Sequence, residues 1–252
     1  MPYNIPLMRR FIPLALVLSS CASAPTAEDA RAHYRQGYQY MTLGDVTLAK
    51  EEFIKAIKAD TTFAEAYCRL GYLYAAEENY VDAMFNYRKA IAFKPSYADA
   101  HYYLALAFLA TGDTAKALEE FYAAVQADSS YIMAREALGS LLLSAGKYEE
   151  AYPHYEVLAK AKYQDLNIQY TFAVLAYYSG HYNEALLPAQ RVAAANDNNP
   201  EVHLLLGSIL TQLGRYGEAG LELQKAFDQF TAKGDSENAA KAKGLLDKIK
   251  KK

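Results

Sequence analysis

Apolar side chains recur along this chain at spacings of three and four residues, in runs that short polar segments interrupt. Such spacing is typical of amphipathic helices, because 3.6 residues make one helical turn. In one example the first run extends from Ala64 to Tyr74, Glu78 and Asn79 form the break, and a second run ends before Pro95. The pattern predicts pairs of antiparallel helices joined by tight turns.

The helix pairs repeat with a period of 34 residues and without insertions. Six units begin at Ala30, Ala64, Ala98, Ile132, Leu166 and Pro200, so the repeats cover residues 30–233. A fixed period of this length predicts a stack of similar units rather than one globular core. Unit positions 8 and 20 hold small residues, such as Gly71 and Ala83, which should let the two helices of a unit approach closely.

Residues 234–252 are predicted to close the stack. Gly234-Asp235-Ser236 offers a helix stop and a new N-cap. The helix that follows should direct four apolar residues toward the last repeat: Ala240, Leu245, Leu246 and Ile249. Solenoids need such a terminal cap, and here it ends in a basic tail.

Two units carry a proline inside the predicted second helix, at Pro153 and Pro188. Proline inside a helix removes a hydrogen bond and costs about 3 kcal/mol or kinks the helix. Unit 5 also has Ala189 where the other units have a large apolar residue. We therefore expect the stack to bend or loosen at these units.

The recurring small and aromatic positions resemble those of the tetratricopeptide-repeat (TPR) family over residues 30–230. The resemblance implies an all-α fold, a right-handed superhelix in which the first helix of each unit lines a concave groove through unit positions 2, 5, 9 and 12. It places these residues in the groove: Tyr34, Tyr38, Met41, Tyr72, Tyr102, Leu106, Leu109, Tyr170 and Tyr177.

The predicted groove is apolar and rich in tyrosine in units 1 to 3, with acids at its lip. TPR domains that clamp a terminal carboxylate use Lys, Arg and Asn at these positions, and such residues are nearly missing here. We therefore expect the groove to bind a hydrophobic, extended or helical segment of another protein. The net charge of −3 does not favour a nucleic-acid partner.

Candidate catalytic or metal-binding chemistry is sparse, since no Ser–His–Asp grouping, phosphate loop, CxxC or HExxH motif occurs. Three histidines share unit position 4, which favours packing or hydrogen bonding over metal ligation: His33, His101 and His203. Paired acids recur on the second helices and are interpreted as a solvated face: Glu51-Glu52, Glu119-Glu120 and Glu149-Glu150. We expect neither an enzyme nor a bound cofactor or metal.

The N-terminus has the features of an export signal. Arg9-Arg10 precedes a short apolar stretch, residues 11–18. The following Leu18-Ser19-Ser20-Cys21 resembles the lipobox of bacterial lipoproteins, in which the signal is cut before a cysteine that then carries lipid. Residues 1–20 are thus predicted to be removed, with the true start at Met1 or Met8, and residues 21–29 to form the lipidated Cys21 and a tether. An ordinary secretory signal with an incidental cysteine is the alternative.

A lipid on Cys21 would anchor the chain to a membrane, because two or three acyl chains hold stably. In the Gram-negative lipoproteins that it resembles, Ala22 favours the outer membrane, facing the periplasm. The remaining cysteine, Cys68, is expected to pack as a small apolar residue.

An anchored chain of six TPRs resembles the pilotins of type IV pilus systems, which help the secretin reach the outer membrane and form its multimer. That resemblance implies a secretin as the partner, although another envelope protein is the alternative. We expect the chain to be a monomer. A TPR lipoprotein scaffold that docks peptidoglycan hydrolases or other envelope enzymes is the alternative. A carbohydrate-binding protein or a subunit of an envelope enzyme is a third possibility, since tyrosines can stack on sugars.

Overall fold

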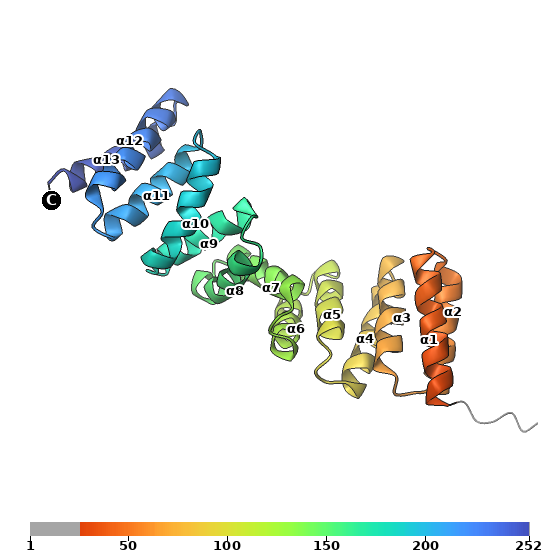
Figure 1. Ribbon diagram of the computed structural model, residues 1–252. Helices are drawn as coiled ribbons and strands as arrows, with labels where there is room; N and C mark the ends of the chain where they lie inside the picture. The colour runs from red at the N-terminus through yellow and green to blue at the C-terminus, as the bar shows by residue number, and fades with distance from the viewer. Residues whose placement is uncertain (1–25, 252) are drawn as a thin grey trace, which may run out of the picture.

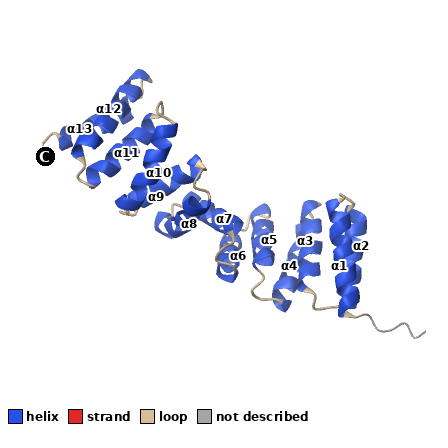
Figure 2. Ribbon diagram, viewed as in Figure 1, coloured by secondary structure: helices blue, strands red, loops and turns tan. Residues whose placement is uncertain are grey.

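The computed structural model describes residues 26–251, in which thirteen helices and no strands follow one another along a single stack (Figures 1 and 2). The helices are α1 (Ala27–Thr42), α2 (Val46–Ala59), α3 (Ala64–Ala76), α4 (Tyr80–Phe93), α5 (Ala98–Ala110), α6 (Thr114–Ala127), α7 (Ile132–Ser144), α8 (Tyr148–Ala161), α9 (Leu166–Tyr178), α10 (Tyr182–Ala195), α11 (Pro200–Gln212), α12 (Tyr216–Ala232) and α13 (Ser236–Ile249). The predicted signal peptide and Cys21 lie outside the described residues. No helix within 26–251 is both long and apolar enough to span a bilayer.

Each repeat is a pair of helices, which we call A (odd numbers, α1 to α11) and B (even numbers, α2 to α12). The A helices of repeats 2 to 6 begin at the residues where the 34-residue units begin. The first helix differs, because α1 begins at Ala27, before the expected start at Ala30. A capping box explains the earlier start: the Asp29 backbone N–H donates to Thr26 Oγ1, and Asp29 Oδ2 accepts from the Thr26 backbone N–H. The predicted tether is therefore shorter than residues 21–29.

The A and B helices of a repeat cross where the A helix has a small residue. A Cβ added at Gly37 would lie 2.9 Å from the Phe53 ring, and one added at Gly207 would lie 2.6 Å from Cγ of Leu223. Such distances are shorter than carbon atoms tolerate, so these positions leave no room for a larger side chain. The close packing expected at unit position 8 is confirmed.

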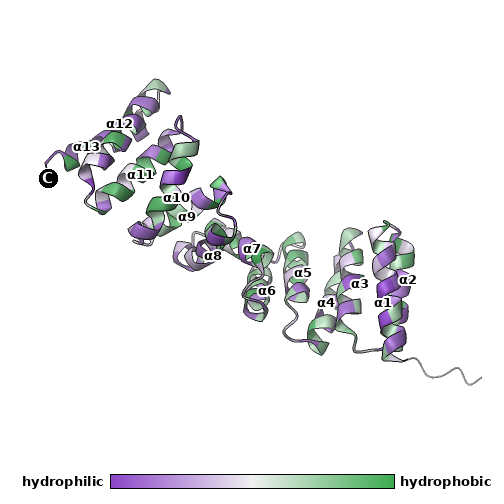
Figure 3. Ribbon diagram, in the orientation of Figure 1, coloured by the Kyte–Doolittle hydropathy of each residue, from purple (hydrophilic) through white to green (hydrophobic). Residues whose placement is uncertain are grey.

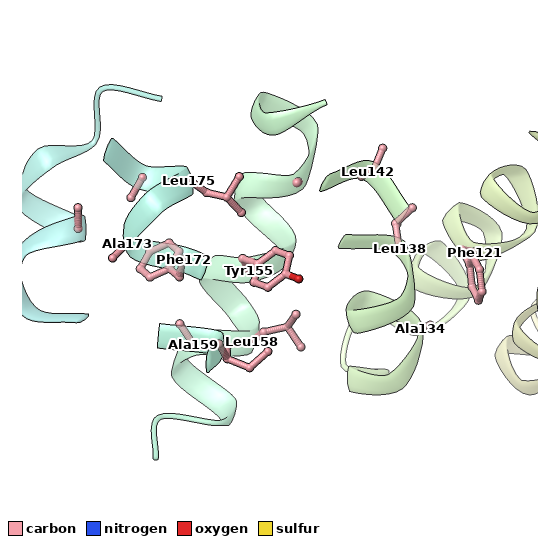
Figure 4. Close-up of a cluster of buried hydrophobic side chains, with 14 of the residues drawn as sticks. Phe121, Ala134, Leu138, Leu142, Tyr155, Leu158, Ala159, Phe172, Ala173 and Leu175 are labelled. Atoms are coloured by element: carbon pink, nitrogen blue, oxygen red, sulfur yellow. The ribbon is translucent and has the colours of Figure 1, made fainter. Parts of the chain in front are cut away.

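The core is a strip that runs through the stack rather than one central cluster. In the middle of the stack, Tyr155 of α8 lies between Phe172 of α9 and Leu138 of α7 (Figure 4). These three side chains are at most 6% exposed. Each repeat thus buries its apolar face against both neighbours, as expected for a solenoid.

Pro153 and Pro188 lie inside α8 and α10, and each helix is assigned without a break. The stack nevertheless changes direction in this region. Helices α1 to α6 run upright in the view of Figure 1, whereas α9 to α13 are tilted, and the change occurs around α7 and α8. The contact between α6 and α7 is also the sparsest between consecutive repeats.

The acids at one predicted surface position pair with the histidines of unit position 4. Nδ1 of His33 lies 2.7 Å from Oε2 of Glu52, and the same contact joins His101 to Glu120. In repeat 6, Nδ1 of His203 lies 2.6 Å from Oε2 of Glu222 in a third pair of the same kind. Glu52 is only 6% exposed, so its assignment to a solvated face is wrong. The pairs join helices A and B of one repeat.

The capping helix α13 packs with a register that differs from the prediction. Ala239, Ala242, Leu246 and Ile249 are buried against the last repeat, whereas Ala240 is exposed. Asp235 is the N-cap, and its side chain accepts from the backbone N–H of Asn238. The capping helix expected from the sequence therefore exists, but Ala239 and Ala242, rather than Ala240, face the last repeat.

Candidate functional site

The residues predicted to line a groove differ in exposure. Four are open to solvent: Tyr38 (46%), Tyr72 (40%), Leu106 (37%) and Leu109 (37%). Four are half-buried: Tyr34, Met41, Tyr170 and Tyr177. Tyr102 is buried, with 8% exposure. All of them belong to A helices, which form one face of the stack.

Tyr38, Tyr72 and Leu106 form an exposed row, here called the inner row, along α1, α3 and α5. All three occupy unit position 9, so they face the same side of successive repeats. The row ends at repeat 4, where unit position 9 holds the small polar Ser140. Helix α5 is mainly hydrophobic and α1 more hydrophilic (Figure 3), so the apolar character increases from α1 toward α5.

Aromatic packing orients the exposed Tyr72 ring. Its centroid lies 5.4 Å from that of Tyr103 in a T-shaped contact, and Tyr103 stacks on the buried Tyr87 at 5.9 Å. Edge-to-face pairs of this kind contribute about 0.5–1.5 kcal/mol beyond area burial. Tyr72 is thus held from one side while its other side remains available to a ligand.

Tyr102 departs from the expectation of an open groove residue. Its ring lies 5.3 Å from both Tyr103 and Tyr131, and 5.9 Å from Phe121. Burial raises the pKa of its hydroxyl. Tyr102 therefore packs between repeats 3 and 4, and the open surface of α5 comes from Leu106 and Leu109.

An ion pair that the sequence analysis missed lies beside the inner row. Nη2 of Arg69 is 3.4 Å from Oδ2 of Asp99, and the guanidinium also interacts with the Tyr34 hydroxyl. Arg69 occupies unit position 6, which the four-position groove pattern omitted. The available signal was that position 6 lies four residues after position 2 and three before position 9, which places all three on one face of the helix. Because Asp99 balances the charge, this part of the surface is close to neutral.

The other end of the A-helix face contains a hollow of about 340 Å³ between α9, α11 and α13, here called the C-terminal hollow. It brings together the predicted Tyr170 and Tyr177, and burial raises the pKa of both hydroxyls. The remaining lining comes from Val174, Tyr178, Glu201, Leu204, Leu205, Ser208, Phe230, Asn238, Lys241 and Leu245.

The sequence pattern did not indicate the hollow itself, because the space depends on how α13 docks. Leu245 of α13 was expected to pack on the last repeat, and it forms one wall. Tyr178 follows Tyr177 at the end of α9 and is 70% exposed at the edge. The hollow is apolar inside, with one acid and one base among its lining residues.

Cys68 of α3 is a buried free thiol outside the exposed surfaces described above. Burial raises the pKa of the Cys68 thiol to about 12, which keeps it protonated and a poor nucleophile. Among residues 26–251 no group of three or more His, Cys, Asp or Glu side chains is arranged to hold a metal ion. The arrangement on the A-helix face instead provides apolar surface with tyrosine hydroxyls, which suits non-covalent binding.

Comparison with known proteins relates the chain to repeat proteins. A family model described as TPR repeat matches residues 72–112, and models described as tetratricopeptide repeat match residues 30–63 and 170–235. None of the curated proteins matches the chain in sequence.

Several solved structures are similar to this chain over most of its length. YrrB, a TPR protein with an unusual peptide-binding site, has a TM-score of 0.57 at 21% identity, and the match covers 76% of this chain and 97% of YrrB. A tetratricopeptide repeat protein from Parabacteroides merdae has a TM-score of 0.53 at 15% identity, and the match covers 89% of this chain and 97% of that protein's chain. The structure of Naa15/Naa10 bound to HypK-THB has a TM-score of 0.62 at 12% identity, and the match covers 87% of this chain and 36% of the matched chain. At these identities the likeness concerns the fold.

Proposed function

Because the chain is a tetratricopeptide-repeat solenoid, we propose that it binds another protein along the A-helix face. The observation that carries the proposal is the exposed inner row of Tyr38, Tyr72 and Leu106. Tyrosine and leucine side chains that are fixed by their own helices and left open to solvent favour association with an apolar partner. The C-terminal hollow adds a second place on the same face for an apolar side chain.

In its specific form, the proposal is a lipid-anchored, pilotin-like role. The lipobox-like Leu18-Ser19-Ser20-Cys21 supports a membrane anchor on Cys21 in the outer membrane, facing the periplasm. The A-helix face would hold an apolar segment of the type IV pilus secretin before the secretin assembles. No covalent step is needed, because shielding an aggregation-prone segment and fixing its place of release both follow from binding.

A scaffold that docks folded envelope enzymes, such as peptidoglycan hydrolases, is the second candidate. The observation that favours it is an apolar surface outside the A helices. Val81 (76% exposed) and Phe85 (56%) lie one turn apart on α4, a B helix. A folded partner can cover both helix faces of a repeat, whereas a single extended segment cannot.

A deletion strain tests the pilotin role directly. Loss of secretin multimers, restored by the wild-type gene and not by Cys21→Ser, is the expected result. Normal multimers without the protein would contradict the role. Affinity capture with the wild-type chain then separates the candidates, because co-purified secretin supports the first and co-purified hydrolases support the second.

A further inference from the structure

The side chain at unit position 4 reaches back to the loop that precedes its own repeat. In repeat 2 the Tyr67 hydroxyl donates to the carbonyl of Thr61, and in repeat 4 Nε of Arg135 donates to that of Ser129 at 2.7 Å. In repeat 3, Nε2 of His101 lies 2.9 Å from the carbonyl oxygen of Pro95. In repeat 6, Nε2 of His203 lies 2.9 Å from the carbonyl oxygen of Asp197. Each acceptor lies six residues before its partner.

A backbone carbonyl can only accept a hydrogen bond, so this slot requires a donor. Arg135 supplies a nitrogen that always carries a proton, and Tyr67 supplies a hydroxyl. Nε2 of His101 and of His203 must therefore carry a proton in order to fill the same role.

The second ring nitrogen of each histidine faces a carboxylate. Nδ1 of His101 lies 2.7 Å from Oε2 of Glu120, and Nδ1 of His203 lies 2.6 Å from Oε2 of Glu222. An ionised carboxylate is also an acceptor only, whereas a neutral imidazole has one donor nitrogen and one acceptor nitrogen. A neutral ring would thus place a lone pair against an oxygen at one of its two contacts.

We propose that His101 and His203 carry protons on both ring nitrogens and act as charged staples. Each staple joins three elements: the loop before the repeat, the A helix that carries the histidine, and the B helix that carries the glutamate. The His101 side chain is 12% exposed and that of His203 is 1% exposed, so water does not readily replace these contacts. Charge-assisted hydrogen bonds of this kind are about twice as strong as neutral ones.

The charged groups around each ring are consistent with this assignment. His101 faces Glu120 of α6 and the carbonyl of Pro95. Burial alone would lower its pKa, and the bonds to Glu120 and Pro95 outweigh burial, so the pKa is raised.

His203 faces Glu222 of α12 on one side. On the other side it faces Asp197 of the preceding loop, whose Oδ1 lies 3.6 Å from Nε2. Nζ of the nearby Lys225 of α12 lies 3.0 Å from Oδ1 of Asp197, so the carboxylate of Asp197 balances the positive charge of Lys225. Two acids and one base therefore lie close to the His203 ring.

The His101 staple makes the loop before repeat 3 sensitive to pH. When the His101 ring loses a proton at higher pH, one of its contacts becomes repulsive, and loop 94–97 loses a tie to the helices. Loop 128–131 is the built-in control, because the Arg135 guanidinium keeps its protons.

Nuclear magnetic resonance of the ¹⁵N-histidine-labelled full chain at pH 7 tests the assignment without any substitution. Both nitrogens of His101 and of His203 should give the chemical shift of a protonated imidazole nitrogen. The buried His154, whose pKa is lowered by burial and by Arg135, should show one unprotonated nitrogen in the same spectrum. An unprotonated nitrogen on His101 or His203 at this pH overturns the proposal.

Hydrogen exchange tests the consequence. After correction for the intrinsic pH dependence, exchange in loop 94–97 should become about tenfold faster above the titration of His101, as expected for losing one charge-assisted hydrogen bond. Exchange in loop 128–131 should not change. Glu120→Gln should make exchange in loop 94–97 independent of the titration of His101, because the Gln amide can donate to Nδ1 while Nε2–H stays on the Pro95 carbonyl. Glu119→Gln, a change at an exposed neighbour, should keep the pH dependence. Equal behaviour of the two variants, or of the two loops, overturns the staple.

Discussion

The ring of Tyr87 fills the space in which a side chain at Gly71 would begin. A Cβ added to Gly71 would lie 2.8 Å from Cε1 of Tyr87 and 3.1 Å from the carbonyl oxygen of Ala83. Because Tyr87 is 1% exposed and packs in the core, it has little room to move. The distance between α3 and α4 is therefore set by the absence of a side chain at Gly71.

Gly71→Ala should destabilise the protein by about 1–3 kcal/mol, although alanine is the better helix former. Urea unfolding followed by circular dichroism measures the change. Gly244→Ala is the matched control, since Gly244 also lies in a helix and a Cβ there meets no atom within 4 Å. The control should stabilise by about 1 kcal/mol. Equal gains in the two variants would contradict the close contact.

Glu78 occupies a backbone conformation that the other repeats give to glycine. Its φ is +61°, and at the same unit position Gly44 has +80° and Gly112 has +85°. Left-handed conformations cost a non-glycine residue about 1 kcal/mol or more. Glu78→Gly should therefore raise the free energy of unfolding by about 1 kcal/mol, and Gly112→Ala should lower it by a similar amount. A loss of stability in Glu78→Gly, measured by the same urea titration, would argue against strain at this turn.

Tyr38 and Tyr72 should contribute more to partner binding than to the stability of the fold. The double variant Tyr38→Ala/Tyr72→Ala should weaken binding of the protein partner at least tenfold, because exposed aromatic anchors often contribute about 2 kcal/mol each. Isothermal titration calorimetry measures the affinity, and circular dichroism checks that helicity is retained. The control is Tyr148→Ala/Tyr163→Ala, a pair with 48% and 54% exposure on or beside the B helix α8. Binding that survives the first double change and fails in the second would move the site off the A-helix face.

Tyr102→Ala should reduce the stability of the fold, whereas substitutions in the inner row should mainly reduce partner binding. Its buried ring contacts three other aromatic rings, so truncation should cost about 3–5 kcal/mol of stability. Tyr102→Phe removes only the hydroxyl and should retain most of the stability. Thermal unfolding of the two variants and of Tyr72→Ala compares them directly. If Tyr72→Ala unfolds at the lower temperature, the division between packing and binding tyrosines is wrong.

The sequence was sufficient to predict the repeat architecture, because periodic spacing and small residues at fixed unit positions act locally within each helix pair. The close approach of Gly71 to Ala83 follows from that pattern alone. Properties that depend on several repeats at once were harder to predict. The burial of Tyr102 requires Tyr131 of the next repeat boundary, and the C-terminal hollow requires the docking of α13.

The histidine–glutamate pairs show that some longer-range contacts leave a readable trace. His33 and Glu52, His101 and Glu120, and His203 and Glu222 are each separated by 19 residues. Glu52 and Glu120 were interpreted from their own helix face, where they resemble solvated residues, and Glu222 was not considered. Examining the two helices of one unit together would have identified the pairs, since opposite charges recur at one spacing.

His154 should make the protein less stable in acid. It occupies the unit position of these glutamates but faces Arg135, is 8% exposed, and has no hydrogen-bond partner for Nδ1. Burial and then Arg135 lower its pKa in the folded state. The unfolded chain therefore binds the proton more readily as the pH falls below about 6.5, and stability decreases toward acid.

A variant at this position separates the contribution of His154 from the other titrating groups. His154→Asn places the residue that repeat 2 uses at the same unit position, where the Asn86 amide donates to the Asp82 carbonyl. The difference in unfolding free energy between pH 7 and pH 5 should be smaller in this variant than in the wild type. Urea unfolding at the two pH values measures both, and His181→Asn, at an exposed histidine, is the control. An unchanged difference in His154→Asn would mean that His154 is protonated equally in both states, which its burial beside Arg135 argues against.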